Sequence, residues 1–325
     1  MEPPVYFPII FFFVVVFNIF GQFGNINIIV LHLKRPSLRT HYGCLLLILS
    51  SCQSICLLFE FVNIYFALDS YFQKTVIYRD DCFYVIFVYV FFMSFQADTV
   101  AAISIDFLFC LCFPLKYRSF QRNCYLPILL AIPFLHSAYL VFFANRYLDH
   151  APIRLCNPPS TLFPDVSKVN YLINLLVATT TLTAYFLGFL TLYLKTRSKV
   201  RVDIERKALR SISVLVVIFL FNRFLGMLLV NVLNFLNVSD ETKSATLDLL
   251  VIAALICLSQ NFYVCYYRSS EYRNMLNSQL SWLIRFFRSD YSPSASVGWT
   301  KSMTTCNHNQ FRMKTQSSLV ITVPS

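Results

Sequence analysis

The chain alternates between long apolar segments and short polar connectors. A membrane-spanning helix needs about 20 predominantly apolar residues. Because the connectors are short, neighbouring helices should pack antiparallel, and the pattern predicts an all-α membrane protein built as a seven-helix bundle. The seven predicted spans are Phe7–His32, Gly43–Leu68, Cys82–Phe113, Tyr125–Ala144, Tyr171–Leu194, Ser211–Asn237 and Ala245–Tyr267.

Composition agrees with a membrane protein. Of the 325 residues, 57% are hydrophobic and only 13% are charged, whereas a soluble domain carries roughly 25% charged residues. The net charge of +11 could suggest nucleic acid as a partner. However, the basic residues lie in short connectors between apolar segments, which favours contact with a lipid bilayer over contact with nucleic acid.

The placement of Lys and Arg predicts the orientation. The connectors after the first, third and fifth segments, and the tail after the seventh, are basic, and the Lys195–Arg210 stretch is the most basic. The remaining connectors mix acids and bases. By the positive-inside rule the N-terminus is extracellular and the C-terminus cytoplasmic. We therefore expect a multi-pass protein of the plasma membrane, in which Asp106 marks the cytoplasmic end of the third segment.

The end of the chain separates into two parts. Leu280, Trp282, Leu283, Phe286 and Phe287 alternate with arginines, which predicts a short amphipathic helix on the inner leaflet. The alternative is a disordered basic tail. From Ser292 onward polar residues dominate, so we expect disorder there. The predicted organisation is a seven-helix membrane domain over residues 1–288, which includes the amphipathic helix, and a disordered cytoplasmic tail over residues 289–325.

Several function classes find no support in the sequence. It contains no Walker loop and no dinucleotide fingerprint. The five histidines are scattered without metal-ligand spacing, and we interpret each as a solvated or interfacial side chain. We therefore expect no enzyme, no metal and no cofactor. A transporter or channel is also less favoured, since no inverted repeat is visible.

A set of short motifs indicates a family. The first segment contains Gly24-Asn25, and the following connector reads Lys-Arg-Pro-Ser-Leu-Arg-Thr. Further motifs are Cys82-Phe83-Tyr84, the stretch from Asp106 to Tyr117 with Pro114, and Asn261 followed by Tyr266 to Arg273. In order and spacing they resemble the nematode serpentine chemoreceptors of the Srsx class, within the rhodopsin-like fold. The resemblance covers roughly residues 24–273.

This resemblance implies a function. Such a receptor senses a small extracellular molecule, such as an odorant or pheromone, and activates a heterotrimeric G protein. The alternative is a receptor-like protein that binds ligand or a partner receptor without the usual activation. The expected partners are the ligand, the G protein and the lipid bilayer, and the sequence leaves a receptor dimer open.

The resemblance also implies a disulfide and a coupling region. In the family, the pair at Cys82 and Cys156 forms a disulfide over the mouth of the bundle; two free thiols are the alternative. Phe107 replaces the Arg that normally follows the acid at the end of helix three, so Asp106 either belongs to an altered lock or merely caps the helix with loop cations. The residues assigned to signalling and G-protein coupling are Asp106, Phe107, Pro114, Tyr117, Arg118, Glu205, Asn261 and Tyr266.

Polar residues inside the spans form the second group. Arg223 stands where the family fold usually has a Trp, and a mid-membrane Arg needs a partner. Asp98 is the first candidate and Glu60 the second. The ion pair would hold a resting state or coordinate an anionic ligand, and a snorkelling Arg is the alternative. Gln53 and Gln96 occupy facing positions in helices two and three, where neutral amides predict no sodium site; two unrelated polar residues are the alternative. With Asn25, these residues form the predicted intramembrane polar switch.

The ligand pocket is expected in the outer half of the bundle, between helices three, five, six and seven. Position alone selects the candidate ligand contacts Tyr84, Tyr89, Phe92, Tyr171, Asn174, Asn231 and Asn234.

Overall fold

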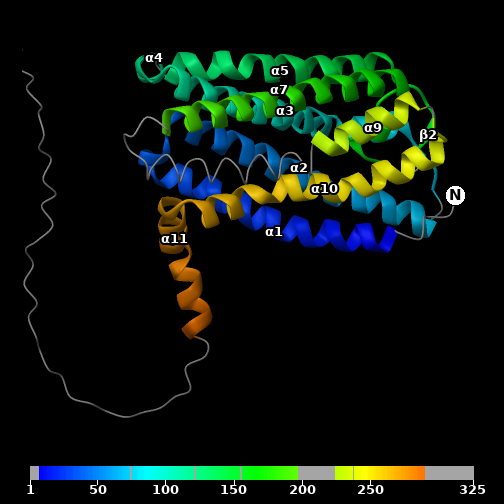
Figure 1. Cartoon of the computed structure of the whole chain (residues 1–325). Helices are drawn as coiled ribbons and strands as arrows, with labels where there is room; N and C mark the ends of the chain where they lie inside the picture. The colour runs from blue at the N-terminus through cyan, green and yellow to red at the C-terminus, as the bar shows by residue number, and fades with distance from the viewer. Residues whose placement is uncertain are drawn as a thin grey trace, which may run out of the picture. The chain divides into compact units, whose positions relative to one another are not determined.

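The computed structural model describes residues 7–73, 75–120, 122–153, 156–196, 224–236 and 238–289. Nearly all of them are helical, and the predicted all-α membrane fold is confirmed (Figure 1). The elements are α1 (Phe7–Lys34), the 3-10 helix η1 (Pro36–Leu38), α2 (His41–Gln73), β1 (Ile77–Tyr78), α3 (Arg79–Cys112), α4 (Pro114–Ser119), α5 (Arg122–Arg146), β2 (Pro152–Ile153), α6 (Pro158–Thr161), α7 (Pro164–Thr196), α9 (Leu225–Phe235), α10 (Asp240–Arg268) and α11 (Ser270–Ser289).

Six of the described helices are long and apolar enough to cross a membrane, namely α1, α2, α3, α5, α7 and α10. In chain order, they correspond to the first five predicted spans and to the seventh. The described part of the remaining span, Ser211–Asn237, is α9, and its first residues lie outside the described ranges. The predicted tail, residues 289–325, also lies almost wholly outside them.

The helices extend beyond the apolar windows that predicted them. The fifth predicted span began at Tyr171, but α7 begins at Pro164, seven residues earlier. Proline is favoured at the first position of a helix, and Asp165 in the first turn complements the positive end of the helix dipole. Hydropathy marks the part of a helix that contacts lipid, whereas capping chemistry decides where the helix starts.

Proline also determines where α3 ends. Phe113 leaves the helical conformation with φ −129° and ψ 58°, and Pro114 starts α4. The ring of a proline disfavours helical backbone at the residue before it, which accounts for the break. The same reasoning applies to Pro36, which follows the end of α1 and starts η1.

The bundle belongs to the first of two units of the chain, Met1–Ser281. Within it, α3 is the most deeply buried of the six spans and α5 the least. The central helix α3 packs against α2, α5 and α7, while α1 packs against α2 and α10. The short α9 contacts α7 and α10 (Figure 1).

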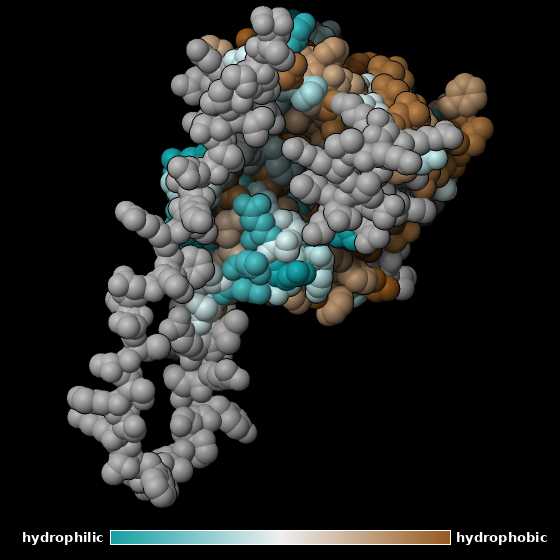
Figure 2. All heavy atoms as spheres, turned by 60° about the vertical axis from the view of Figure 1, so that its left-hand side comes forward, coloured by the Kyte–Doolittle hydropathy of each residue, from teal (hydrophilic) through white to brown (hydrophobic). Residues whose placement is uncertain are grey.

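The outer surface of the bundle is strongly apolar. Large hydrophobic side chains are exposed along several helices, including Phe12, Phe134, Leu135, Phe142 and Phe186. Figure 2 shows brown, hydrophobic side chains over the visible flank, with teal, hydrophilic ones gathered in one area of this face. An apolar surface this extensive fits contact with lipid tails, so this is a multi-pass membrane protein.

The two ends of the bundle carry different structures. At one end, called here the disulfide end, β1 pairs antiparallel with β2 and Ile77 lies opposite Ile153. At the other, the α4 end, Leu276 of α11 is completely buried in a cluster with Ile28, Leu31 and Phe262. The predicted helix after the seventh span is therefore present as α11, and its first part packs on the bundle.

Candidate functional site

A disulfide joins Cys82, in the first turn of α3, to Cys156, just before α6. The Cα atoms lie 5.6 Å apart and both cysteines are buried, so the predicted pairing is confirmed. Arg79 adds a salt bridge to Asp149 and a hydrogen bond from Nε to the Ser160 carbonyl oxygen at 3.3 Å. Together with the β1–β2 pair, these contacts hold the segment around α6 on the start of α3.

A cavity of about 140 Å³ lies next to this segment. Residues of α3, α5, α6, α7, α9 and α10 line it, among them Met93, Leu140 and Met227, and so does Leu162 just after α6. Most of the lining is apolar, and the polar lining side chains are Ser94, Gln96, Asn170, Tyr171 and Asn174. These elements include the four between which the sequence placed a ligand pocket, namely α3, α7, α9 and α10, and add α5 and α6.

The predicted ligand contacts divide into two groups. Tyr171 and Asn174 line the cavity. Tyr84, Tyr89 and Phe92 do not line it.

The reasons differ from residue to residue. Tyr84 is 63% exposed on the outside of the bundle, and Phe92 packs against the apolar core. Tyr89 is buried and donates its hydroxyl hydrogen bond to Glu60. Asn231 donates to the Tyr171 carbonyl oxygen at 3.2 Å, so it ties α9 to α7. Nothing is described of the Asn234 side chain.

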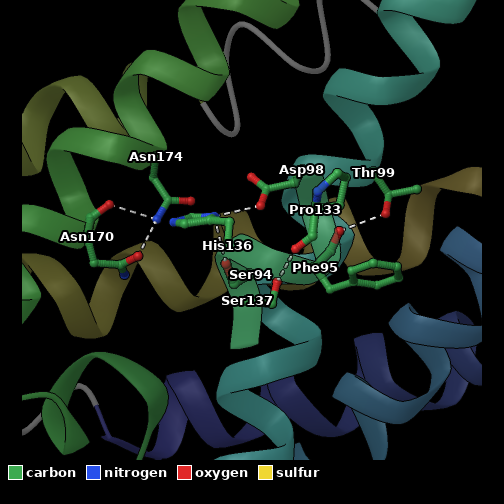
Figure 3. A network of polar contacts seen from close by, with 9 residues as sticks. All are labelled: Ser94, Phe95, Asp98, Thr99, Pro133, His136, Ser137, Asn170 and Asn174. Carbon is green, nitrogen blue, oxygen red and sulfur yellow. Dashed lines mark hydrogen bonds and ion pairs between the residues drawn. The ribbon is translucent and has the colours of Figure 1, made fainter. Parts of the chain in front are cut away.

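A polar network that the sequence did not predict begins at the cavity lining, with Ser94 and Asn174 (Figure 3). His136 of α5 places Nδ1 2.6 Å from Asp98 Oδ2 and 3.4 Å from Ser94 Oγ, both on α3. Figure 3 shows Asn174 on the α7 side of the His136 ring, where its Nδ2 donates to Asn170. The interpretation of every histidine as solvated or interfacial is therefore wrong for His136. An apolar run reveals no partner on a distant helix, so the sequence carried no signal for this pair.

The predicted partners of Arg223 have other contacts. Arg223 itself lies outside the described residues. Asp98 pairs with His136, and its second oxygen, Oδ1, accepts no hydrogen bond from a described residue. Glu60 accepts hydrogen bonds from Tyr89 and from Asn63. A pairing of Arg223 with Asp98 therefore stays a prediction.

The predicted polar residues of α1 and α2 join a network with α10. Asn261 Nδ2 donates to Gln53 Oε1 at 2.7 Å, and Gln53 Nε2 donates to the Cys257 carbonyl oxygen at 3.2 Å. Asn25 Nδ2 donates to the Leu258 carbonyl oxygen at 3.0 Å. Gln53 therefore faces α10, and the expected contact between Gln53 and Gln96 is not made.

At the α4 end, Asp106 is buried and accepts a hydrogen bond from the Tyr117 hydroxyl at 3.1 Å. Its described partner is a tyrosine, whereas the alternative considered above expected loop cations. Burial, and then the nearby Asp106 carboxylate, raise the pKa of the Tyr117 hydroxyl well above its ordinary value. The hydroxyl therefore stays protonated and keeps donating to Asp106. Pro114 begins α4, which carries Tyr117 to this position.

Phe107 makes an apolar contact between α3 and α7. Its ring packs with Tyr185 and Leu192, and it lies over Gly188, where an added Cβ would be 2.8 Å from its Cε1. The position that carries an Arg in the resembled receptors is thus part of a hydrophobic contact here. Glu205, the expected lock partner, lies outside the described residues, and nothing is described of the Arg118 side chain.

A second buried histidine lies near the α4 end. His32 Nδ1 is 2.9 Å from the Ile28 carbonyl oxygen, and Nε2 is 3.1 Å from the Tyr272 hydroxyl of α11. The solvated interpretation is therefore wrong for His32 as well. Burial is the main cause that raises the pKa of Tyr272, followed by Cys265 and Glu271. Tyr266 stacks on Phe262 within the same part of the bundle.

The described residues contain no group of three or more His, Cys, Asp or Glu side chains that could hold a metal ion. The features brought together are a small cavity, a disulfide-held segment beside it, and polar contacts along α3.

Comparison with known proteins identifies the family. No curated protein matches the sequence. The sequence model of the family described as serpentine type 7TM GPCR chemoreceptor Srsx matches residues 18–280, which begin within α1 and include the later spans, the disulfide and the cavity. Since this match covers most of the 325 residues, the chain belongs to the Srsx family of serpentine, seven-transmembrane G-protein-coupled chemoreceptors.

Proposed function

We propose that this chemoreceptor binds a small extracellular molecule in the cavity beside the disulfide and activates a heterotrimeric G protein at the α4 end. The observation that carries the proposal is the cavity, which is lined by residues of five of the bundle's helices and of α6. Ligand sites in helix bundles are usually apolar cavities between helices with a few convergent polar groups. The cavity beside Gln96 and Asn174 has this character.

The proposed orientation places the disulfide end outside the cell. Disulfides persist in oxidising surroundings, which supports an extracellular position for Cys82 and Cys156. Lys34, Arg35 and Lys116 lie at the α4 end, where the positive-inside rule expects the cytoplasm. A small molecule would then reach the cavity from outside, and the α4 end would face the G protein.

The proposed link between the two ends is α3. It lines the cavity through Met93, Ser94 and Gln96, and it carries Asp106 and Phe107 in its last two turns. Because a helix is stiff along its axis, a ligand that shifts α3 against α7 would also disturb the Phe107 contact over Gly188. In this proposal, the part that changes on activation is the apolar contact between Phe107 of α3 and α7.

One observation favours a second function. Phe107 is engaged with Tyr185 and Leu192 and has no charge with which to contact a G protein as an Arg would. A receptor-like protein that binds ligand, or a partner receptor, without the usual activation would carry such a residue without loss. This alternative keeps the cavity and drops the coupling.

Measuring G-protein activation in cells separates the two functions. The unchanged chain and Phe107→Arg are challenged with a broad pool of small metabolites at matched surface levels. A response from the unchanged chain supports the receptor function. Silence from the unchanged chain with a response from Phe107→Arg supports the receptor-like alternative.

Phe109→Arg is the matched control. Phe109 lies two residues further along α3 and stacks on Phe120, so an Arg there adds the same charge away from the contact with α7. A gain of activity in both variants would indicate a general effect of charge at this end, and it would argue against a specific role of position 107.

A further inference from the structure

The cavity contains a buried amide that has no partner among the described residues. Gln96 is 2% exposed and lines the cavity, and its carboxamide forms no hydrogen bond with any described residue. An unpaired polar group in apolar surroundings costs about 1–3 kcal/mol, and a bilayer core offers little water to compensate. An amide in this position needs a partner that the described part of the chain does not supply.

The rest of the described lining shows what that partner is. Beside Gln96, the polar lining groups are the neutral side chains of Ser94, Asn170, Tyr171 and Asn174, and no described lining residue is charged. The nearby acid Asp98 is held by His136 at 2.6 Å and does not line the cavity. No described lining residue supplies a counter-ion for a charged ligand, and burying an unpaired charge is costly.

The cavity also limits the size of the ligand. At about 140 Å³ it is close to the engineered apolar cavity of roughly 150 Å³ that binds benzene. Its apolar lining, with Met93, Leu162, Met227 and Leu250, suits a hydrocarbon body.

We infer that the cavity takes a neutral molecule of about the size of benzene, with an apolar body and one hydroxyl or carbonyl group that hydrogen-bonds to Gln96. Amines and carboxylates of the same size are rejected. The inference rests on the proposed function for the location of the ligand. It adds the chemical class of the ligand and the residue that recognises its polar group.

The test is a set of ring compounds of similar size on the purified full-length chain. Cyclohexanol and cyclohexanone are neutral and polar, cyclohexylammonium and cyclohexanecarboxylate are charged, and methylcyclohexane has no polar group. The thermal midpoint of unfolding is titrated with each. We expect the neutral polar pair to stabilise the chain saturably, with an affinity at least about tenfold above the two charged compounds.

Variants connect this preference to the amide. Gln96→Leu should weaken the binding of cyclohexanol about tenfold and leave that of methylcyclohexane unchanged or tighter. Gln260→Leu is the control, because Gln260 of α10 is a partly buried glutamine that does not line the cavity. It should leave the whole series unchanged.

The outcomes decide the inference. A charged compound that binds as tightly as cyclohexanol, or a chain that neither neutral polar compound stabilises, overturns it. Equal losses in Gln96→Leu and Gln260→Leu overturn the role of Gln96. The series on the unchanged chain tests the charge preference without any variant.

Failure of the proposed function has a different signature. Selective binding of cyclohexanol without G-protein activation leaves the ligand class standing and removes the coupling. Activation by a charged compound supports the receptor function and overturns the ligand class.

Discussion

Two parts of the bundle contain the same side chain in opposite states. Between α1, α2 and α10, Gln53 uses its carboxamide oxygen for Asn261 and its amide group for the Cys257 carbonyl oxygen. Beside the cavity, Gln96 is equally buried at 2% exposed and bonds with no described residue. Burial and residue type are equal, so the difference lies in what the neighbouring helices offer.

The comparison separates an amide that holds helices together from one that is available to a ligand. The α1–α2–α10 interface is closely packed, and further side-chain bonds cross it, such as that from Asn18 Nδ2 to the Leu57 carbonyl oxygen at 2.7 Å. On the side of the cavity, the Cys82–Cys156 disulfide holds one end of α3, and the apolar contact of Phe107 with α7 holds the other. Substitutions in the two parts should therefore have different consequences.

Breaking the disulfide should have the largest effect, since it removes the covalent tie of the cavity side. Cys82→Ser and Cys156→Ser should each lower the free energy of unfolding by about 2–5 kcal/mol and reduce surface delivery to a similar degree. Thermal unfolding and surface labelling measure both. Cys124→Ser, at an exposed free cysteine, is the control and should change neither. A harmless change at only one of the paired cysteines would contradict the interpretation.

The His136–Asp98 contact should come next. His136→Leu or Asp98→Leu leaves one buried partner alone, so each should cost about 1–3 kcal/mol of unfolding free energy. The double variant should cost clearly less than the two single losses combined, because the residues interact directly. Thermal unfolding of all four chains completes the cycle. His150→Leu, at an exposed histidine, should have little effect. Additive losses would show that the contact does not stabilise the bundle.

Two glycines extend the comparison to packing. A Cβ at Gly24 would lie 2.7 Å from Phe262 Cβ, which cannot move without the backbone of α10, so Gly24→Ala should destabilise by about 1–3 kcal/mol. A Cβ at Gly188 would meet the Phe107 ring, which can rotate, so Gly188→Ala should change stability by less than about 1 kcal/mol. Thermal unfolding of both variants checks the order. The reverse order would mean that the α3–α7 contact is the more tightly packed one.

The two glutamines should show the smallest effect on stability. Hydrogen bonds between membrane helices average about 0.6 kcal/mol and reach about 1.7. Gln53→Leu should therefore cost an amount in this range, whereas Gln96→Leu should be neutral or stabilising, since it removes an unpaired polar group. Thermal unfolding without ligand measures both. Equal losses would indicate that Gln96 has a structural partner.

The sequence predicted the general architecture well, because a bilayer imposes strict length and composition rules. The described helices follow the apolar segments, and the departures occur at their ends, as at Pro164, where α7 begins, and at Ser239, which caps α10. The disulfide was predicted through the family resemblance, since Cys82 and Cys156 by themselves are only two cysteines on the same side. The family assignment depended on the order of several short motifs.

The candidate site was only partly predictable. Tyr171 and Asn174 were selected by position and line the cavity, but Tyr84 is exposed and Tyr89 is bonded to Glu60. A span that is apolar nearly all round has no clear polar face, so its pattern does not reveal which side faces the cavity. His136 and His32 were missed for the same reason, since their partners come from other helices or from an ordinary backbone carbonyl.

By itself the sequence determined the membrane environment, the succession of spans and the family, because these depend on local composition and on short motifs. Only the tertiary structure decided that Gln53 is bonded whereas Gln96 bonds with no described residue, that His136 holds Asp98, and that Phe107 fills the space over Gly188. The physical reason is that a hydrogen bond or a packing contact depends on two positions at once. The second position lies on another helix, at a distance along the chain that no local pattern records.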